Sequence, residues 1–229
     1  MKFNVLKELL LELRRNKYYI ISGLVIMIFS FLLPVITEGR SNLEDGFIET
    51  MTAFFLLIIS VFYLILFIRK RHIVNILFFL LFLFACGEEI SWGQRILKFD
   101  TPSSLKSENL QGEFNIHNLK LFNAVNEEGH PTKGLNFNLL FVLFCLGYGI
   151  VLPFLVLLFG GLSKFVTLLG VDVPPLSIGS LFVVKSIISQ LFFSGPIYTN
   201  LRIGESSEFI SVFILFLITL TFVKERKNI

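Results

Sequence analysis

Six apolar stretches, each close to the length needed to cross a lipid bilayer, constrain this chain more than any other feature. A helix rises about 1.5 Å per residue and the hydrocarbon core is about 30 Å thick, so one crossing takes about 20 mostly apolar residues. These stretches are too long and too uniformly apolar for the strands of a barrel. The sequence therefore predicts an all-α, polytopic transmembrane helical bundle that forms one integral membrane domain, residues 1–229. The expected spans are residues 18–36, 48–68, 73–92, 139–158, 178–198 and 208–223.

The composition also indicates a lipid environment. Hydrophobic residues make up 54% of the chain and 28 residues are Phe, which is more than a water-soluble core needs. The net charge is only +3, and the basic residues lie in short clusters between apolar runs, so nucleic acid is not expected as a partner, whereas membrane lipids are. Cys86 and Cys145 fall inside apolar runs, so neither a disulfide nor a thiolate metal site is indicated.

The distribution of Lys and Arg predicts the orientation of the bundle. Cytoplasmic flanks of membrane proteins are enriched in these residues. Here they crowd the N-terminal flank, the link at residues 69–71 and the C-terminal tail, while the connections on the other side are richer in acid. We therefore expect the N-terminus and the C-terminus to be cytoplasmic.

The connection between the third and fourth spans, residues 93–136, is long enough to contain structure of its own. Thr-Pro at 101–102 is typical of a helix start, with Thr as the cap and Pro at the first helical position, leading into residues 103–110. Apolar residues at helical spacing over 116–125, before Gly-His-Pro at 129–131, predict a second short helix. Both are expected to be interfacial helices in a long outer loop.

The end of the third expected span carries the densest set of candidate site residues. Glu88 lies about 23 Å along that helix, and therefore about 7 Å below the outer surface. A carboxylate at that depth is costly unless it has a partner or faces a wet cavity. If the helix continues, Glu88, Trp92 and Arg95 share one face, whereas Glu89 points about 100° away.

Two interpretations follow from this arrangement. In the structural one, Glu88 pairs with Arg95 and Trp92 anchors the span at the interface. In the functional one, Glu88 and Glu89 are candidate catalytic acids, with Glu88 preferred because it shares a face with Arg95. Arg95, Trp92 and Gln94 then bind the substrate.

A second polar cluster, residues 109–118, is unusually rich in amide, acid and imidazole groups for a linker. On a helix Glu113 and His117 would share a face, which could orient the imidazole or supply two metal ligands, but the spacing is not a recognised zinc pattern, so no metal site is predicted. His117 is a candidate catalytic residue, and Asn115 and Asn118 are candidate substrate-binding residues. A surface His with ordinary hydrogen bonds is the alternative. We predict that Glu88 and His117 belong to one site, because a polar cluster above an under-solvated acid stabilises both.

The remaining spans contribute isolated polar residues. Lys185 is expected about 10 Å above the inner edge, where it either pairs with an acid such as Glu88, as part of the substrate site, or extends its ammonium to the inner surface. Pro153 should kink the fourth span. A polar stripe accompanies Lys185, formed by Ser180, Ser186, Ser189, Gln190 and Ser194, and further polar residues flank other spans at the outer face, namely Glu49, Arg202, Glu205 and Glu208.

The strings GEEISWGQRI at 87–96 and NLQGEFNIHNL at 109–119, with Thr-Pro at 101–102 between them, resemble an uncharacterised family of bacterial multi-pass membrane proteins. The resemblance implies the bacterial plasma (inner) membrane and assigns no activity to any residue. A second resemblance is to glutamate-type intramembrane proteases of the CAAX-processing kind. Their motif places an Arg four residues after the second Glu, whereas Arg95 lies six residues after Glu89.

An enzyme acting on a lipid-linked or amphiphilic substrate at the extracytoplasmic face is the leading functional hypothesis. Two acids, an imidazole and an arginine near the interface would supply general acid/base and anion-binding groups. The alternatives are a transporter or ion pathway that continues inward past Lys185, and a structural membrane subunit. The sequence identifies no cofactor and no oligomeric state.

Overall fold

A computed structural model describes residues 2–43, 46–123, 137–193, 195, 197 and 200–224. All regular structure in these residues is helical, apart from an isolated β-bridge between Asn109 and Leu119. The longer helices are α1 (Lys2–Arg15), α2 (Lys17–Ile36), α3 (Phe47–Lys70), α4 (Ile73–Glu89), α8 (Phe137–Leu146), α9 (Leu152–Leu158), α10 (Gly160–Leu169), α12 (Leu181–Phe192) and α14 (Ile203–Lys224). The shorter ones are η1 (Arg40–Asn42), η2 (Ser91–Gly93), α5 (Gln94–Leu97), α6 (Ser103–Glu108), α7 (Lys120–Asn123), the π-helical η3 (Gly147–Val151) and α11 (Leu176–Gly179).

Four helices are long and apolar enough to cross a membrane: α2, α3, the continuous helix Phe137–Leu158 and α14. The described part of the chain is therefore all-helical, and its four apolar helices are those of a membrane-embedded protein. Two of the six expected spans are shorter in the structure, because α4 has 17 residues and ends at Glu89 instead of Trp92, and α12 has 12 residues. Whether these two also cross the membrane stays a prediction.

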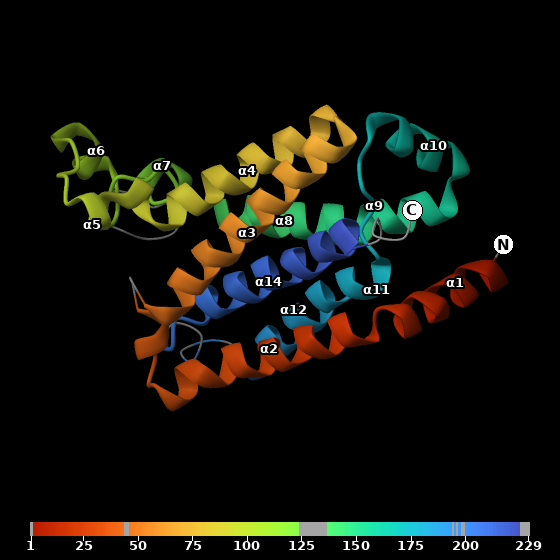
Figure 1. Cartoon of the computed structure of the whole chain (residues 1–229). Helices are drawn as coiled ribbons and strands as arrows, with labels where there is room; N and C mark the ends of the chain where they lie inside the picture. Colours follow the sequence, from red (N-terminus) through yellow and green to blue (C-terminus); the bar gives the residue numbers. More distant parts are fainter. Residues whose placement is uncertain are drawn as a thin grey trace.

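The long helices run side by side and alternate in direction (Figure 1). α2, α4 and α12 run toward the end of the bundle where α5, α6 and α7 gather, and α3, α8–α9 and α14 run back. We call the end that carries α5–α7 the α5–α7 end. The N-terminal end of α1 and the C-terminal end of α14 both point toward the other end (Figure 1).

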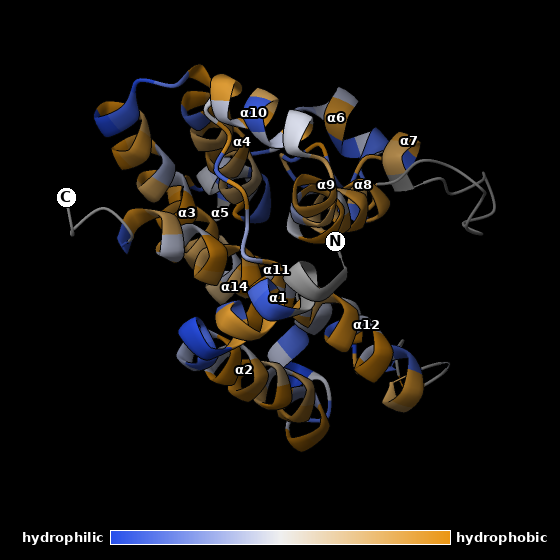
Figure 2. Cartoon of the chain, turned by 90° about the vertical axis from the view of Figure 1, so that its right-hand side faces the viewer, coloured by the Kyte–Doolittle hydropathy of each residue, from blue (hydrophilic) through white to orange (hydrophobic). Residues whose placement is uncertain are grey.

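α14 forms the centre of the bundle. In the apolar stretch of α14, 72% of the residues are buried inside the protein, compared with 22–39% in the other three candidate spans. Viewed along the helices, α14 lies between α2, α3 and α12, and hydrophobic residues cover much of the outer helices (Figure 2). Val25, Ile28 and Leu32 of α2 are among the exposed apolar residues, as expected for a surface in contact with lipid.

The fourth expected span has an irregular turn just before Pro153, the residue at which a kink is predicted. Proline lacks an N–H and cannot continue the regular bonding pattern of an α-helix. The helix widens into the π-turn η3, in which the Leu152 amide bonds the Gly147 carbonyl five residues earlier. α11 packs directly on this turn, because a Cβ built on Gly179 would lie 1.8 Å from the carbonyl oxygen of Gly149. Only glycine fits at position 179.

We therefore expect Gly179→Ala to destabilise the protein by several kcal/mol, more than the roughly 1–3 kcal/mol typical of an overfilled core, because the added methyl group meets backbone. The measurement is the midpoint of thermal unfolding of the purified protein in detergent. Gly161→Ala is the matched control, because nothing lies within 4 Å of a Cβ at that position. Equal midpoints for the two variants would show that α11 does not pack on η3 as described.

Candidate functional site

The chain reverses direction directly after α4. Ser91, Trp92 and Gly93 have φ angles of 46°, 54° and 77°, so the helix cannot continue through them. The condition under which Glu88, Trp92 and Arg95 would share one face, a helix that continues past Glu89, is therefore not met. The reversal instead returns the Trp92 ring to α4, where its indole Nε1 donates a hydrogen bond of 2.7 Å to Glu88. The side chain of Arg95 lies outside the part of the chain that the structure describes.

Glu88 is the anchor between α4 and the outer polar segment, residues 109–119. Its side chain accepts hydrogen bonds from the Trp92 indole and from the backbone amides of Ile116 at 2.6 Å and His117 at 2.8 Å. These charge-assisted bonds compensate for the burial of the residue, which is only 4% exposed. His117 Nδ1 lies 3.5 Å from Glu88 Oε2, within the range of an ion pair. The predicted proximity of Glu88 and His117 is confirmed.

The outer polar segment is a compact loop and not a helix. Gly112 has a φ of 71°, and the Asn109 side chain accepts hydrogen bonds from the amides of Gln111 and Glu113. Asn109 Nδ2 in turn donates to the buried Asn115 at 2.8 Å. The helix on which Glu113 and His117 would share a face therefore does not form, because the Asn109 side chain bonds backbone groups that a helix would pair.

Hydrogen bonds from this loop fasten it to the turn after α4. Glu113 Oε2 accepts from Ser91 Oγ at 2.6 Å and from Asn115 Nδ2 at 3.0 Å. Gln94, expected to bind a substrate, accepts from the Phe114 amide and donates to Thr101 Oγ1, each at 2.7 Å. Gln94 and Asn115 thus hold the fold of the loop together.

The two predicted short helices are present in part. α6 begins one residue later than expected, with Pro102 at the cap position, where its carbonyl accepts from Leu105 and Lys106. α7 covers only Lys120–Asn123 of the expected 116–125 helix. The predicted stop at 129–131 lies outside the described residues.

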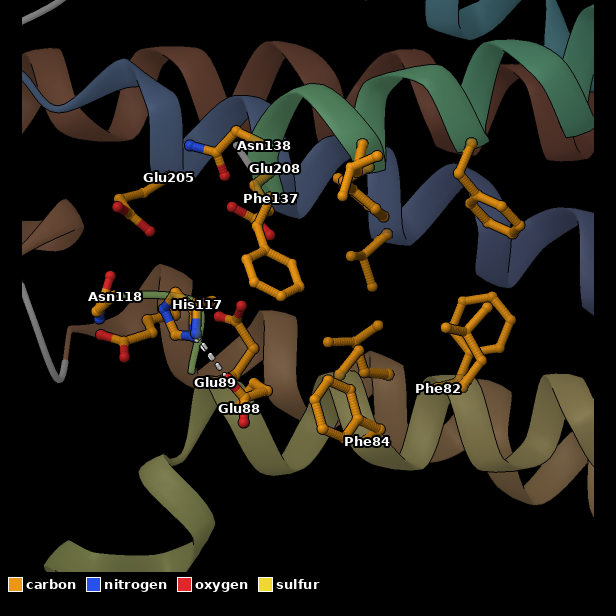
Figure 3. A pocket seen from close by; sticks show the side chains of 18 of the residues that line it. Phe82, Phe84, Glu88, Glu89, His117, Asn118, Phe137, Asn138, Glu205 and Glu208 are labelled. Atoms are coloured by element: carbon orange, nitrogen blue, oxygen red, sulfur yellow. Dashed lines mark hydrogen bonds and ion pairs between the residues drawn. The ribbon is translucent and has the colours of Figure 1, made fainter. Parts of the chain in front are cut away.

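A cavity of about 410 Å³ opens beside Glu88 (Figure 3). Its wall is built from α3, α4, α8, α14 and the outer polar segment. One end is polar, lined by Glu49, Glu88, Glu89, Glu113, His117, Asn118, Arg202, Glu205 and Glu208. The rest is apolar, lined by Leu56, Leu81, Phe82, Phe84, Ala85, Leu140, Phe141, Phe144 and Val212. We call these the acidic end and the apolar section.

Glu89 and Glu208 differ from the other acids of the cavity. Neither carboxylate has a hydrogen bond or ion pair with another residue that the structure describes. Both side chains extend into the same space, Glu89 from α4 and Glu208 from α14 (Figure 3). These two carboxylates are therefore free to meet a ligand.

The apolar section is not sealed by neighbouring side chains. Leu81 and Phe84 on α4 are 45% and 36% exposed, and Leu140 on α8 is 42% exposed. A second cavity of about 390 Å³, mostly apolar, shares Glu49 and Glu89 with the first. Both apolar spaces thus adjoin the acidic end.

Lys185 does not pair with Glu88, although it lies close enough to Glu208 for their charges to attract. Its ammonium donates to Ser211 Oγ at 2.8 Å and approaches the Ser207 carbonyl at 3.4 Å, both on α14, and Lys185 does not line the cavity. The expected partner, Glu88, is engaged elsewhere. Other residues of the acidic end had no predicted role, and the signal that marked them was an acid at the outer end of an apolar span, as in Glu49, Glu205 and Glu208.

Among the described residues, no three His, Cys, Asp or Glu side chains are grouped as metal ligands would be. Comparisons of the chain with models of protein families, with curated proteins and with solved structures found no match. The resemblance of the two motif strings to a bacterial membrane family therefore stays a prediction. The chemistry of the site has to be inferred from its own geometry.

Proposed function

We propose that this protein is a membrane enzyme that acts on an amphiphilic or lipid-linked substrate. One observation carries the proposal: a single cavity combines an acidic end with an apolar section. A substrate with a polar head and an apolar chain would bury both parts in this space, each against matching side chains. The volume of about 410 Å³ is within the usual range for small-ligand sites, about 300–1,000 Å³.

Glu89 and Glu208 are the groups to which we assign the chemistry. Two carboxylates without protein partners, facing one space, can divide general base and general acid catalysis between them. In a hydrolysis, one carboxylate would take a proton from a water whose oxygen attacks the head group, and the other would protonate the leaving group. Glu88 then acts as a positioning residue, because its hydrogen bonds hold His117 at the acidic end.

We further propose six crossings, with both termini in the cytoplasm of a bacterium and the acidic end near the extracytoplasmic surface of its inner membrane. The alternating helix directions support this arrangement (Figure 1). Three basic residues lie at the end of the bundle opposite the α5–α7 end: Arg14 on α1, Lys70 on α3 and Lys164 on α10. The positive-inside rule places such residues in the cytoplasm. α4 and α12 would then complete the six, although each is short for a crossing.

The proposed orientation predicts which positions an impermeant thiol reagent reaches in intact cells. Ser107→Cys on α6 should react from outside, whereas Glu8→Cys on α1 and Thr167→Cys on α10 should react only after permeabilisation. All three positions are exposed, and both native cysteines are buried, so background labelling should be low. Labelling of Glu8→Cys in intact cells would overturn the orientation.

The contacts of Lys185 make the transport alternative less suitable. A route inward requires polar groups that are available to a solute. The described hydroxyls of Ser180, Ser186 and Ser211 instead donate to carbonyls of their own helical segments, and the Lys185 ammonium is held by α14. These groups are already paired.

The proposed function predicts a change in the lipids of membranes that contain the active protein. Ala85 lines the apolar section, so Ala85→Phe should fill part of it and block the substrate. Leu83→Phe is the matched control, because Leu83 is exposed on the same helix and does not line the cavity. Mass spectrometry of lipid extracts should show one amphiphile consumed and a product formed with the wild type and Leu83→Phe, but not with Ala85→Phe. If wild-type extracts match those of Ala85→Phe in every amphiphile, the proposal is wrong.

A further inference from the structure

The acidic end of the cavity has a strong imbalance of charge. Six glutamates line it, and the basic residues that line it with them are Arg202 and His117. Lys185 lies outside the lining and attracts Glu208. Arg202 is exposed, so water screens its charge more than it screens the buried Glu88. The residues that line this space therefore favour a positive group within it and oppose a negative one.

The protein itself satisfies only part of this acidic end. Glu88 accepts three hydrogen bonds, and Glu113 is bonded by Ser91 and Asn115. Glu89 and Glu208 have no comparable donor among the described residues, although each is partly buried. Carboxylates in such a place are stabilised most by a cation that also donates hydrogen bonds.

The apolar section is a separate observation, and it indicates the other half of the ligand. It continues from the acidic end between α4, which contributes Leu81 and Phe84, and α8, which contributes Leu140 and Phe141. These side chains line the cavity, so an alkyl chain can lie against them there. An alkyl chain would cover this surface, at about 0.8 kcal/mol for each buried CH₂.

We propose that the ligand of this cavity is a cationic amphiphile, in which a primary amine or other ammonium group is attached to an apolar chain. The ammonium lies at the acidic end, close to Glu89 and Glu208, and the chain lies along Phe84 and Leu140. This inference rests on the proposed function and narrows its substrate class. It reverses the expectation that the site binds an anionic group through arginine.

The intrinsic fluorescence of Trp92 provides the test. Trp92 is the only tryptophan of the chain, and its indole bonds Glu88 at the acidic end, so a bound head group should change its emission. The full-length protein in phosphatidylcholine nanodiscs is titrated with dodecylammonium, dodecyl sulfate and dodecanol, three probes with the same chain. We expect the Kd of dodecylammonium to be about tenfold lower than the Kd of either other probe, which corresponds to about 1.4 kcal/mol.

Two variants distinguish binding of the probe in the cavity from its general partitioning into the nanodisc. The double variant Glu89→Gln/Glu208→Gln should lose the preference for dodecylammonium, whereas Glu108→Gln, an exposed acid on α6, should keep it. If dodecyl sulfate or dodecanol binds as tightly as dodecylammonium in the wild type, the cationic class is wrong while an amphiphile site stands. If no probe changes the emission and Ala85→Phe behaves as the wild type, the cavity is not an amphiphile site, and both proposals fail.

Discussion

Glu88→Ala should detach the outer polar segment from α4 and lower the free energy of unfolding by about 3–5 kcal/mol. The change removes the acceptor for three donors, the Trp92 indole and the amides of Ile116 and His117. Each buried donor left unsatisfied costs about 1–3 kcal/mol. Thermal unfolding in detergent measures the loss, and limited proteolysis should cut the segment earlier than in the wild type.

Two comparisons make this prediction specific to Glu88. Glu88→Gln keeps one carbonyl oxygen, so it should recover part of the loss. Glu108→Ala removes an exposed acid and should change stability by no more than about 0.5 kcal/mol. If Glu88→Ala unfolds at the same temperature as Glu108→Ala, Glu88 does not anchor the segment.

Unlike Glu88→Ala, which lowers stability, Glu89→Gln should abolish function without lowering stability. Glu89 has no hydrogen bond among the described residues, and Glu49, Glu88 and Glu208 line the same cavity, so a charge on Glu89 is opposed by like charges. Neutralising it therefore removes repulsion, and the unfolding midpoint should stay level or rise. Removal of a general acid or base should lower turnover of the amphiphile about 10²–10⁴-fold.

The measurement is the rate at which the amphiphile identified by mass spectrometry disappears, together with the unfolding midpoint of the same preparation. Glu208→Gln should match Glu89→Gln, and the double variant should be little worse than either, because paired groups act as a unit. Full turnover in Glu89→Gln would remove it from the chemistry. A collapse in stability would show that its role is structural.

The sequence predicts much of this arrangement, because depth in a membrane limits what a charged residue can do. The apolar runs predict the helices, and the cost of burying Glu88 correctly predicts a polar roof that contains His117. The irregularity at Pro153 follows from its missing N–H. In each case a single local constraint decides the outcome.

Other parts were not predictable, because they depend on backbone choices that the residue pattern leaves open. The positive φ angles of Ser91 and Trp92 end α4 early, and neither residue type normally favours them. The amides of the loop at residues 109–119 are bonded by the side chains of Asn109, Gln94 and Glu88, so helical spacing there was misleading. The reversal after α4 and the loop bring three hydrogen-bond donors to Glu88 and none to Glu89.

The acidic end as a whole also depends on tertiary packing. Glu49 and Glu208 lie on helices far apart in the sequence, and only the positions of α3 and α14 relative to α4 bring them to one cavity. In the sequence alone, each of these residues is simply an acid at the end of an apolar span. A cavity forms where several helices do not fill the space between them, so it cannot be predicted from any single stretch of sequence.

Photolabelling with an alkyl ammonium that carries a diazirine near the end of its chain tests the central claim most directly. The protein is labelled in nanodiscs, digested and mapped by mass spectrometry, with and without excess unlabelled amphiphile. The account predicts saturable labelling at Phe84 on α4 and Leu140 on α8, which the competitor removes and Ala85→Phe reduces. Labelling there that is no more saturable than at Val25 and Leu32, on the exposed face of α2, would contradict an amphiphile site in the cavity.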